Sequence, residues 1–149
     1  MNMKKNLLVI FDSNEFSGHE KMGLKITQAL RQETTILTTS PNIKKSMPDN
    51  FNIYQVSFRT VIKLSFGRDV LLISGSPYGS LFLKICIWII GGRITEYTPF
   101  PELKAMQDRF HHKFVPIINR ITVKKRILIE DWQAPLSSVK NIFIIKNLI

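Results

Sequence analysis

Four consecutive residues, Ser17, Gly18, His19 and Glu20, combine a hydroxyl, an unhindered backbone, an imidazole and a carboxylate. They match the capping box, in which the serine hydroxyl accepts a hydrogen bond from the amide three residues on and the glutamate reaches back to the serine amide. Helix initiation alone explains this pattern. A ligand would suit the same geometry, because Gly18 lets it approach the backbone and a helix N-terminus attracts phosphate or carboxylate groups. The first candidate site is therefore the loop of residues 12–20, which begins at Asp12.

This loop lacks the phosphate-binding patterns of two large enzyme classes. Neither the dinucleotide fingerprint G-x-G-x-x-G nor the phosphate loop G-x-x-x-x-G-K-[ST] occurs in it. A nicotinamide-dependent oxidoreductase and a P-loop NTPase are therefore disfavoured.

A second candidate segment is residues 75–79, Gly-Ser-Pro-Tyr-Gly. Ser76 as N-cap and Pro77 at the first helical position explain it by helix initiation alone. If the segment faces the first loop, Gly75 and Tyr78 form a wall of the site. Both interpretations stay open.

Glu96 and Tyr97 end an expected strand, at the edge where parallel sheets bind ligands. Each is interpreted as a site residue, with a solvated strand end as the alternative. His111 and His112 do not suggest a metal site, because adjacent helical side chains point about 100° apart and cannot hold one ion together. We expect no metal ion.

Short apolar and β-branched runs predict about seven strands. They lie at residues 7–11, 34–39, 51–56, 69–74, 93–97, 126–130 and 141–145. Helices are expected at residues 20–31, 59–66, 79–90 and 102–123, with a break near Pro116. We expect a loop between the second and third strands, a helix end at Gly91, and a short turn at Pro135.

Strands that alternate with helices form a mainly parallel sheet covered by helices on both faces. We therefore predict a single α/β domain with a Rossmann-like sheet. Ligands of such sheets bind outside the carboxyl ends of the strands, at the switch point beside the first strand. This rule selects three loops, residues 12–20, 75–79 and 96–101.

The amino-acid composition and net charge limit which classes of partner the chain is expected to bind. The chain has 149 residues, 44% of them hydrophobic, which is enough for one core. Its net charge of +10 is spread over most segments and favours anionic partners. No nucleic-acid-binding motif occurs, so nucleic acid is disfavoured. Residues 113–126 mix apolar and basic positions, which fits a core-facing helix with solvated lysines or a helix resting on an anionic membrane.

The single cysteine, Cys86, excludes an internal disulfide and is expected to be a buried small hydrophobe. The N-terminal apolar run is too short for a signal peptide, and no run is long enough to span a bilayer. We expect a cytoplasmic protein, with peripheral contact at the inner face of the cell membrane.

Residues 16–26, FSGHEKMGLKI, resemble the Gly-Gly-Ala-Glu-type loop and first helix of family 4 glycosyltransferases of the GT-B fold. Residues 69–77, 91–97, 126–130 and 142–147 resemble, in order and spacing, the later strands of the N-terminal half of these enzymes. The resemblance covers nearly the whole chain. It implies an acceptor-binding half, which in this family works without an essential metal or cofactor and uses a nucleotide sugar as donor.

The resemblance also implies roles for particular residues. Gly18 and His19 would lie close to the donor phosphates or the acceptor. Ser17 replaces the first glycine of the usual pair, and Tyr97 stands where many members carry a catalytic histidine. The general base is therefore sought among Asp12, His19 and Glu96, with Ser17, Gly18, Gly75, Tyr78 and Tyr97 as substrate-binding candidates.

The family's donor-binding half would begin where this sequence ends, so we expect it to be absent and the chain alone to turn over no nucleotide sugar. The first hypothesis is an acceptor domain for a glycan or a polyprenyl-phosphate-linked acceptor, as in polysaccharide biosynthesis. The second is a noncatalytic subunit that recruits a separate donor subunit to a membrane. The third is a Rossmann-like nucleotide-binding or regulatory domain.

Overall fold

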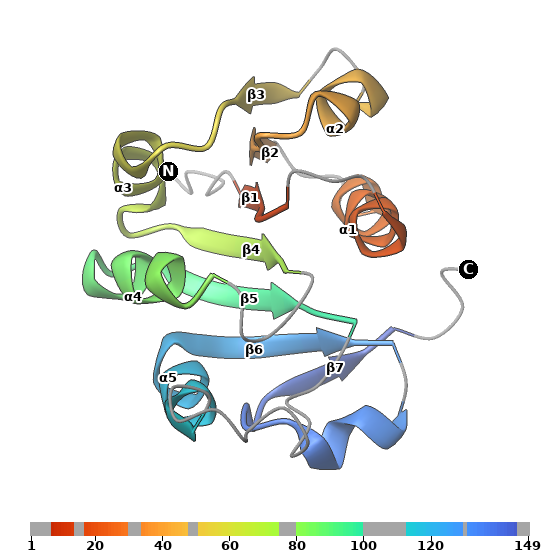
Figure 1. The fold of residues 1–149 in the computed structure, drawn as a ribbon, viewed down its shortest axis with the longest axis vertical. Coiled ribbons are helices and arrows are strands. Elements are labelled where there is room, and N and C mark those ends of the chain that lie inside the picture. The colour runs from red at the N-terminus through yellow and green to blue at the C-terminus, as the bar shows by residue number, and fades with distance from the viewer. Residues whose placement is uncertain are drawn as a thin grey trace, which may run out of the picture.

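The fold is a seven-stranded, entirely parallel sheet. The computed structural model describes residues 7–13, 17–29, 34–47, 51–74, 80–99, 113–129 and 131–145. The strands are β1 (Leu7–Phe11), β2 (Thr34–Leu37), β3 (Asn52–Tyr54), β4 (Asp69–Ile73), β5 (Arg93–Tyr97), β6 (Val123–Leu128) and β7 (Ile142–Ile144). Their order across the sheet is β3-β2-β1-β4-β5-β6-β7, and every neighbouring pair is parallel (Figure 1). The predicted α/β, Rossmann-like class is confirmed.

Helices cover both faces of this sheet. They are α1 (Gly18–Ala29), α2 (Pro41–Ser46), α3 (Phe58–Ser65), α4 (Leu81–Ile89) and α5 (Val115–Thr122), with a 3₁₀ helix, η3, at Asp131–Leu136. In Figure 1, α1 and α2 lie on one side of the sheet and α3, α4 and α5 on the other. Because each helix returns the chain to start a parallel strand, the helix N-termini lie at the carboxyl edge of the sheet.

Two apolar clusters, one on each face, form the core. The first joins Leu8, Ile10 and Leu72 of the central strands to Val61 of α3 and Ile87 of α4. The second packs the opposite side chains of those strands, such as Val9 and Ile73, against Ile26 of α1 and Ile43 of α2. β1 and β4 are therefore buried on both faces, which explains their continuous apolar sequences.

The prediction of a loop between β2 and β3 is wrong, because this stretch contains α2. Ser40 is the N-cap of α2, its side chain accepts from the Ile43 amide at 3.5 Å, and Pro41 occupies the first turn. Ile43 and Met47 then bury apolar side chains against the sheet. The sequence signal for α2 is the pair Ser40-Pro41, which has the same helix-start pattern as Ser76 and Pro77.

Element boundaries differ from expectation near the C-terminus. Pro116 lies in the first turn of α5, where its missing N–H has no helical partner to lose. β6 begins at Val123, three residues earlier than predicted, directly after α5. The turn around Pro135 is η3. Much of the expected helix over residues 102–123 lies outside the described residues.

The end of α4 is as predicted from its glycine pair. The Gly91 amide donates to the Trp88 carbonyl and the Gly92 amide to the Ile87 carbonyl, at 3.0 and 2.9 Å. Gly91 adopts a φ of 79°, which glycine alone adopts without strain. Cys86, predicted to be buried, is only partly so.

Candidate functional site

The predicted loops begin at the carboxyl edge of neighbouring strands. Asp12 follows β1, Ser74 follows β4 and Thr98 follows β5, and these strands lie side by side. The Asp12 amide donates to Ile73 at 3.1 Å and the Ser74 amide to Tyr97 at 3.0 Å, so the ladder continues past the strand ends. The candidate residues Gly75 and Tyr78, with His111 and His112, lie outside the described residues.

The start of α1 is a compact polar cluster. The Glu20 carboxylate accepts from the Ser17 amide at 2.8 Å, which confirms the glutamate half of the capping box. The Ser17 hydroxyl differs from expectation, since it donates to the same carboxylate at 2.7 Å and lies 2.8 Å from His19 Nδ1. His19 Nε2 also contacts the other Glu20 oxygen. Gly18 is exposed, and a Cβ there would meet nothing within 4 Å.

Glu20 is buried, and burial by itself raises the pKa of its carboxyl group. Hydrogen bonds from the Ser17 and Ser13 hydroxyls and from the amides of Ser17 and Glu20 act against burial. Together they hold the pKa of Glu20 below its ordinary value. Glu20 is thus a charged cap at the start of α1.

Tyr97 lies on the α1 side of the sheet. Its side chain is only 1% exposed, and within the described part of the chain its hydroxyl has no hydrogen-bond partner. Burial and then the nearby Glu20 charge raise the pKa of Tyr97 to about 12. Tyr97 is therefore a neutral, buried phenol, packed with Phe11 and Ile73.

Glu96 lies on the opposite side of the sheet, inside an ion network. One of its carboxylate oxygens pairs with Lys84 of α4, and the other accepts from Arg126 Nε and Nη2 at 3.0 and 2.7 Å. Lys84 also donates to Asn119 of α5 at 2.9 Å, and Arg126 to Ser137 at 2.9 Å. Lys84, Glu96, Asn119 and Arg126 are all 0% exposed. The network ties β5 and β6 to α4 and α5.

Sequence reasoning did not find this network. Lys84 interrupts an apolar helix, and a charge in such a run is the available signal that a buried partner exists. Arg126 follows two lysines in β6, so its sequence context carries no such signal. Their partner could not be deduced, because Glu96 is separated from Arg126 by 30 residues.

Asp12 is the accessible carboxylate of this edge. Although the residue is exposed, neighbouring protein atoms desolvate its carboxyl group and raise its pKa. A hydrogen bond with Ser80 and the charge of Lys84 act in the opposite direction, while Glu96 adds to the rise. Ser80, just before α4, has a φ of 54°, a strained conformation for a serine.

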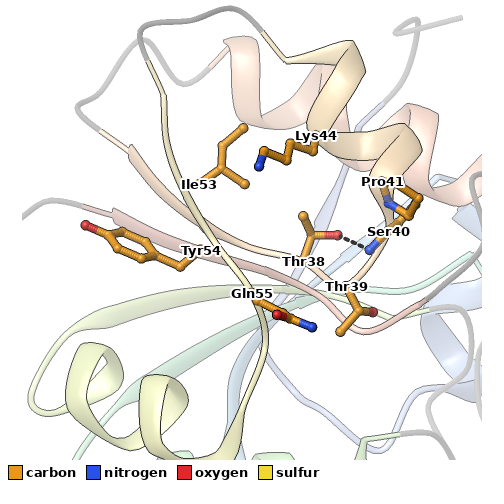
Figure 2. Close-up of a pocket in the computed structure, with 8 residues that line it drawn as sticks. All are labelled: Thr38, Thr39, Ser40, Pro41, Lys44, Ile53, Tyr54 and Gln55. Atoms are coloured by element: carbon orange, nitrogen blue, oxygen red, sulfur yellow. Dashed lines mark hydrogen bonds between the residues drawn. The ribbon is translucent and has the colours of Figure 1, made fainter.

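A pocket lies farther along the same edge, where β2 and β3 end. It encloses about 220 Å³ and is lined by Thr38, Thr39, Ser40, Pro41, Lys44, Ile53, Tyr54 and Gln55 (Figure 2). Figure 2 shows hydroxyl groups from the end of β2 on one side, with the Thr38 hydroxyl accepting from the Ser40 amide at 3.1 Å. None of the residues predicted for the site lines this pocket. The signal for it was the hydroxyl run Thr38-Thr39-Ser40 directly after a strand.

The described residues contain neither a metal-ligand cluster nor a membrane-spanning helix. No group of three or more histidine, cysteine, aspartate or glutamate side chains is arranged there to hold a metal ion. None of the helices in that part of the chain is both long and apolar enough to cross a bilayer.

The fold and this edge define an α/β protein with a Rossmann-like parallel sheet. Scanned against models of known protein families and against curated protein sequences, the chain matches none.

Proposed function

We propose that the chain is the acceptor-side domain of a GT-B type glycosyltransferase, which uses a nucleotide sugar as donor and a glycan or a polyprenyl-phosphate-linked molecule as acceptor. The observation that carries the proposal is the carboxyl edge at β1. An exposed carboxylate, Asp12, ends this strand, and an unobstructed backbone position, Gly18, starts the next helix. The strand order, with β1 between β2 and β4, supports ligand binding at this switch point.

Asp12 is the general base in this proposal. A base must accept a proton from the acceptor hydroxyl, and it works best when its proton affinity is raised toward the working pH. Asp12 is exposed, so an acceptor hydroxyl can reach it, and its pKa is raised, so it holds a proton more readily than an ordinary aspartate. His19 is the second candidate, because its imidazole lies at the start of α1 beside Ser17.

Gly18 binds the anionic group of the acceptor, while Ser17, whose amide and hydroxyl both donate to Glu20, holds the cap of α1. The amides of the first helical turn attract a phosphate, and the absence of a side chain at Gly18 lets the phosphate reach them. Glu96 and Tyr97 are buried, so the proposal gives them a part in positioning the edge. Gly75 and Tyr78 remain candidates for the wall of the site.

The test is binding of a short-chain polyprenyl phosphate, measured by calorimetry. We expect G18A to weaken binding about tenfold, because it places a methyl group between ligand and backbone. D12N should not weaken binding, because a general base contacts the acceptor hydroxyl and a carboxylate does not attract a phosphate. The matched control for D12N is D69N, which removes a carboxylate from the opposite edge of the sheet. Wild-type affinity in G18A would overturn the proposal.

A nucleotide-binding module is the second candidate function, and the pocket beside β2 favours it. Rossmann-like sheets place a ribose at the end of this strand, and here the pocket offers the Thr38 and Thr39 hydroxyls and the Lys44 ammonium group. Titration with uridine and adenosine diphosphates separates the two functions. Tight nucleotide binding that K44M weakens and G18A does not would favour this second function.

A further inference from the structure

The outer surface of the layer formed by α3, α4 and α5 is apolar. Phe58 of α3 is 61% exposed, and Phe66, directly after α3, is 73% exposed. Phe82 and Ile89 of α4 are 71% and 68% exposed. Ile117 and Ile121 of α5 are each 55% exposed. These six side chains, which we call the apolar face, are each more than half exposed.

The three helices that carry the apolar face are neighbours. The rings of Phe58 and Phe82 stack with their centroids 6.1 Å apart, which joins α3 to α4. α4 in turn packs beside α5. Figure 1 shows the three helices together on one side of the sheet. Large contiguous apolar surfaces mark binding sites.

Two of the three buried residues of α5 are polar. Its inward positions include the buried polar residues Asn119 and Thr122, and Asn119 accepts the Lys84 hydrogen bond. Its outward positions include Ile117 and Ile121. A helix that only closed the core would show the opposite pattern. The outward isoleucines are therefore explained by something that covers them.

Charge indicates what covers this face. The sequences of α3, α4 and α5 contain no aspartate or glutamate. Exposed cations accompany the apolar residues: Arg59 and Lys63 on α3, Arg120 on α5, and Lys113 just before it. Apolar side chains beside cations, without carboxylates, complement the anionic surface of a bilayer.

We propose that the apolar face docks this protein peripherally on anionic membranes. Its phenylalanine and isoleucine side chains enter the interface between headgroups and acyl chains, and the cations of α3 and α5 bind lipid phosphates. Docking rests on a different surface from the carboxyl edge, so it does not depend on the proposed function.

The experiment is sedimentation of the whole chain with vesicles of phosphatidylcholine alone and of phosphatidylcholine with phosphatidylglycerol. We expect binding to the anionic vesicles and weak binding to the neutral ones. F58S/F82S should lower the partition coefficient by about tenfold or more, because two exposed rings no longer enter the bilayer. The matched control is F143S, since Phe143 is 53% exposed and is paired in register with Ile127, which packs on the α1 side of the sheet.

Charge reversal tests the electrostatic part. K63E/R120E should lower binding to anionic vesicles about tenfold or more, because each cation near such a surface contributes about 1 kcal/mol. K45E/K125E makes the same charge change away from the apolar face and should have a clearly smaller effect. Equal effects of the two double variants would contradict docking through this face.

Trp88 gives a readout that needs no substitution in the apolar face. It lies on α4 and is 49% exposed, and W132F leaves it as the single tryptophan. We expect its emission to shift to shorter wavelength with anionic vesicles and to be quenched by brominated lipid. An unchanged spectrum would overturn the proposal, as would F58S/F82S converting a dimer to a monomer with vesicle binding intact, which would assign the face to a second copy.

Discussion

Two carboxylates on neighbouring strands illustrate how environment decides what one residue contributes. Glu96 is 0% exposed and holds Lys84 and Arg126, whereas Asp69 is partly exposed and pairs with Arg93 at the opposite edge. The Asp69 pair is screened by water and contributes little. The Glu96 network is buried, so its loss leaves two cations without a counter-charge.

We therefore predict that E96Q lowers the free energy of unfolding by about 3–5 kcal/mol, as expected when one partner of a buried ion pair is removed. The measurement is equilibrium urea denaturation followed by circular dichroism. D69N is the matched control and should produce a clearly smaller loss. Comparable losses in the two variants would contradict the interpretation that burial makes the Glu96 network contribute more to stability than the Asp69 pair.

Tyr97 makes stability depend on alkaline pH. Its pKa is raised to about 12, while a phenol in the unfolded chain titrates near 10. As pH rises from about 10 to about 12, the unfolded chain releases a proton that the folded chain keeps, so the free energy of unfolding falls. This contribution is fully present below about pH 10.

The corresponding prediction concerns Y97F, measured by urea denaturation at about pH 8 and about pH 10.5. The variant should lose less stability than the wild type between these two pH values. Y54F, a change at a tyrosine 48% exposed on β3, serves as the control for general alkaline effects. The same pH dependence in wild type and Y97F would show that Tyr97 ionises as readily in the folded chain.

At the scale of elements, the approach of α1 to β4 depends on Gly23. A Cβ at this position would lie 2.6 Å from Ile73 Cγ2, closer than packed atoms allow. α1 can pack this closely against β4 because Gly23 has no side chain. Gly18, five residues earlier in the same helix, has open space instead.

We expect G23A to destabilise the protein by about 1–3 kcal/mol through overpacking, measured as the shift of the urea midpoint. G18A is the paired control and should leave stability unchanged or slightly raised, since alanine favours the helix more than glycine does. This control also validates the binding test, because a ligand-binding loss in G18A then has no folding cause. A stable G23A protein would mean that α1 moves freely against β4.

For the whole molecule, the sheet order predicts where local opening begins. β1 and β4 lie at the centre with buried residues on both faces, whereas β3 and β7 are edge strands with no fully buried residue among them. Amide hydrogen exchange should therefore be slowest in β1 and β4 and fastest in β3 and β7. Equal protection of β7 and β1 would contradict this description of the core.

The local structure follows from the residues alone. The apolar runs of β1 and β4 predict buried parallel strands, because a strand covered on both faces needs apolar side chains on both. Gly91 with Gly92 predicts the end of α4, because this signal depends on hydrogen bonds close in the chain. The glutamate half of the capping box at Ser17 was predicted for the same reason. α2 was missed although Ser40 and Pro41 carry a helix-start pattern.

Which charges are buried and which apolar side chains are exposed depends on contacts between distant elements. Glu96 belongs to an ion network because α4 and β6 bring Lys84 and Arg126 to it from distant parts of the chain. Likewise, the apolar sequence of α4 indicates a buried helix, yet Phe82 and Ile89 lie at the surface. Helical periodicity groups side chains on a face, and only the neighbouring elements determine whether that face is covered.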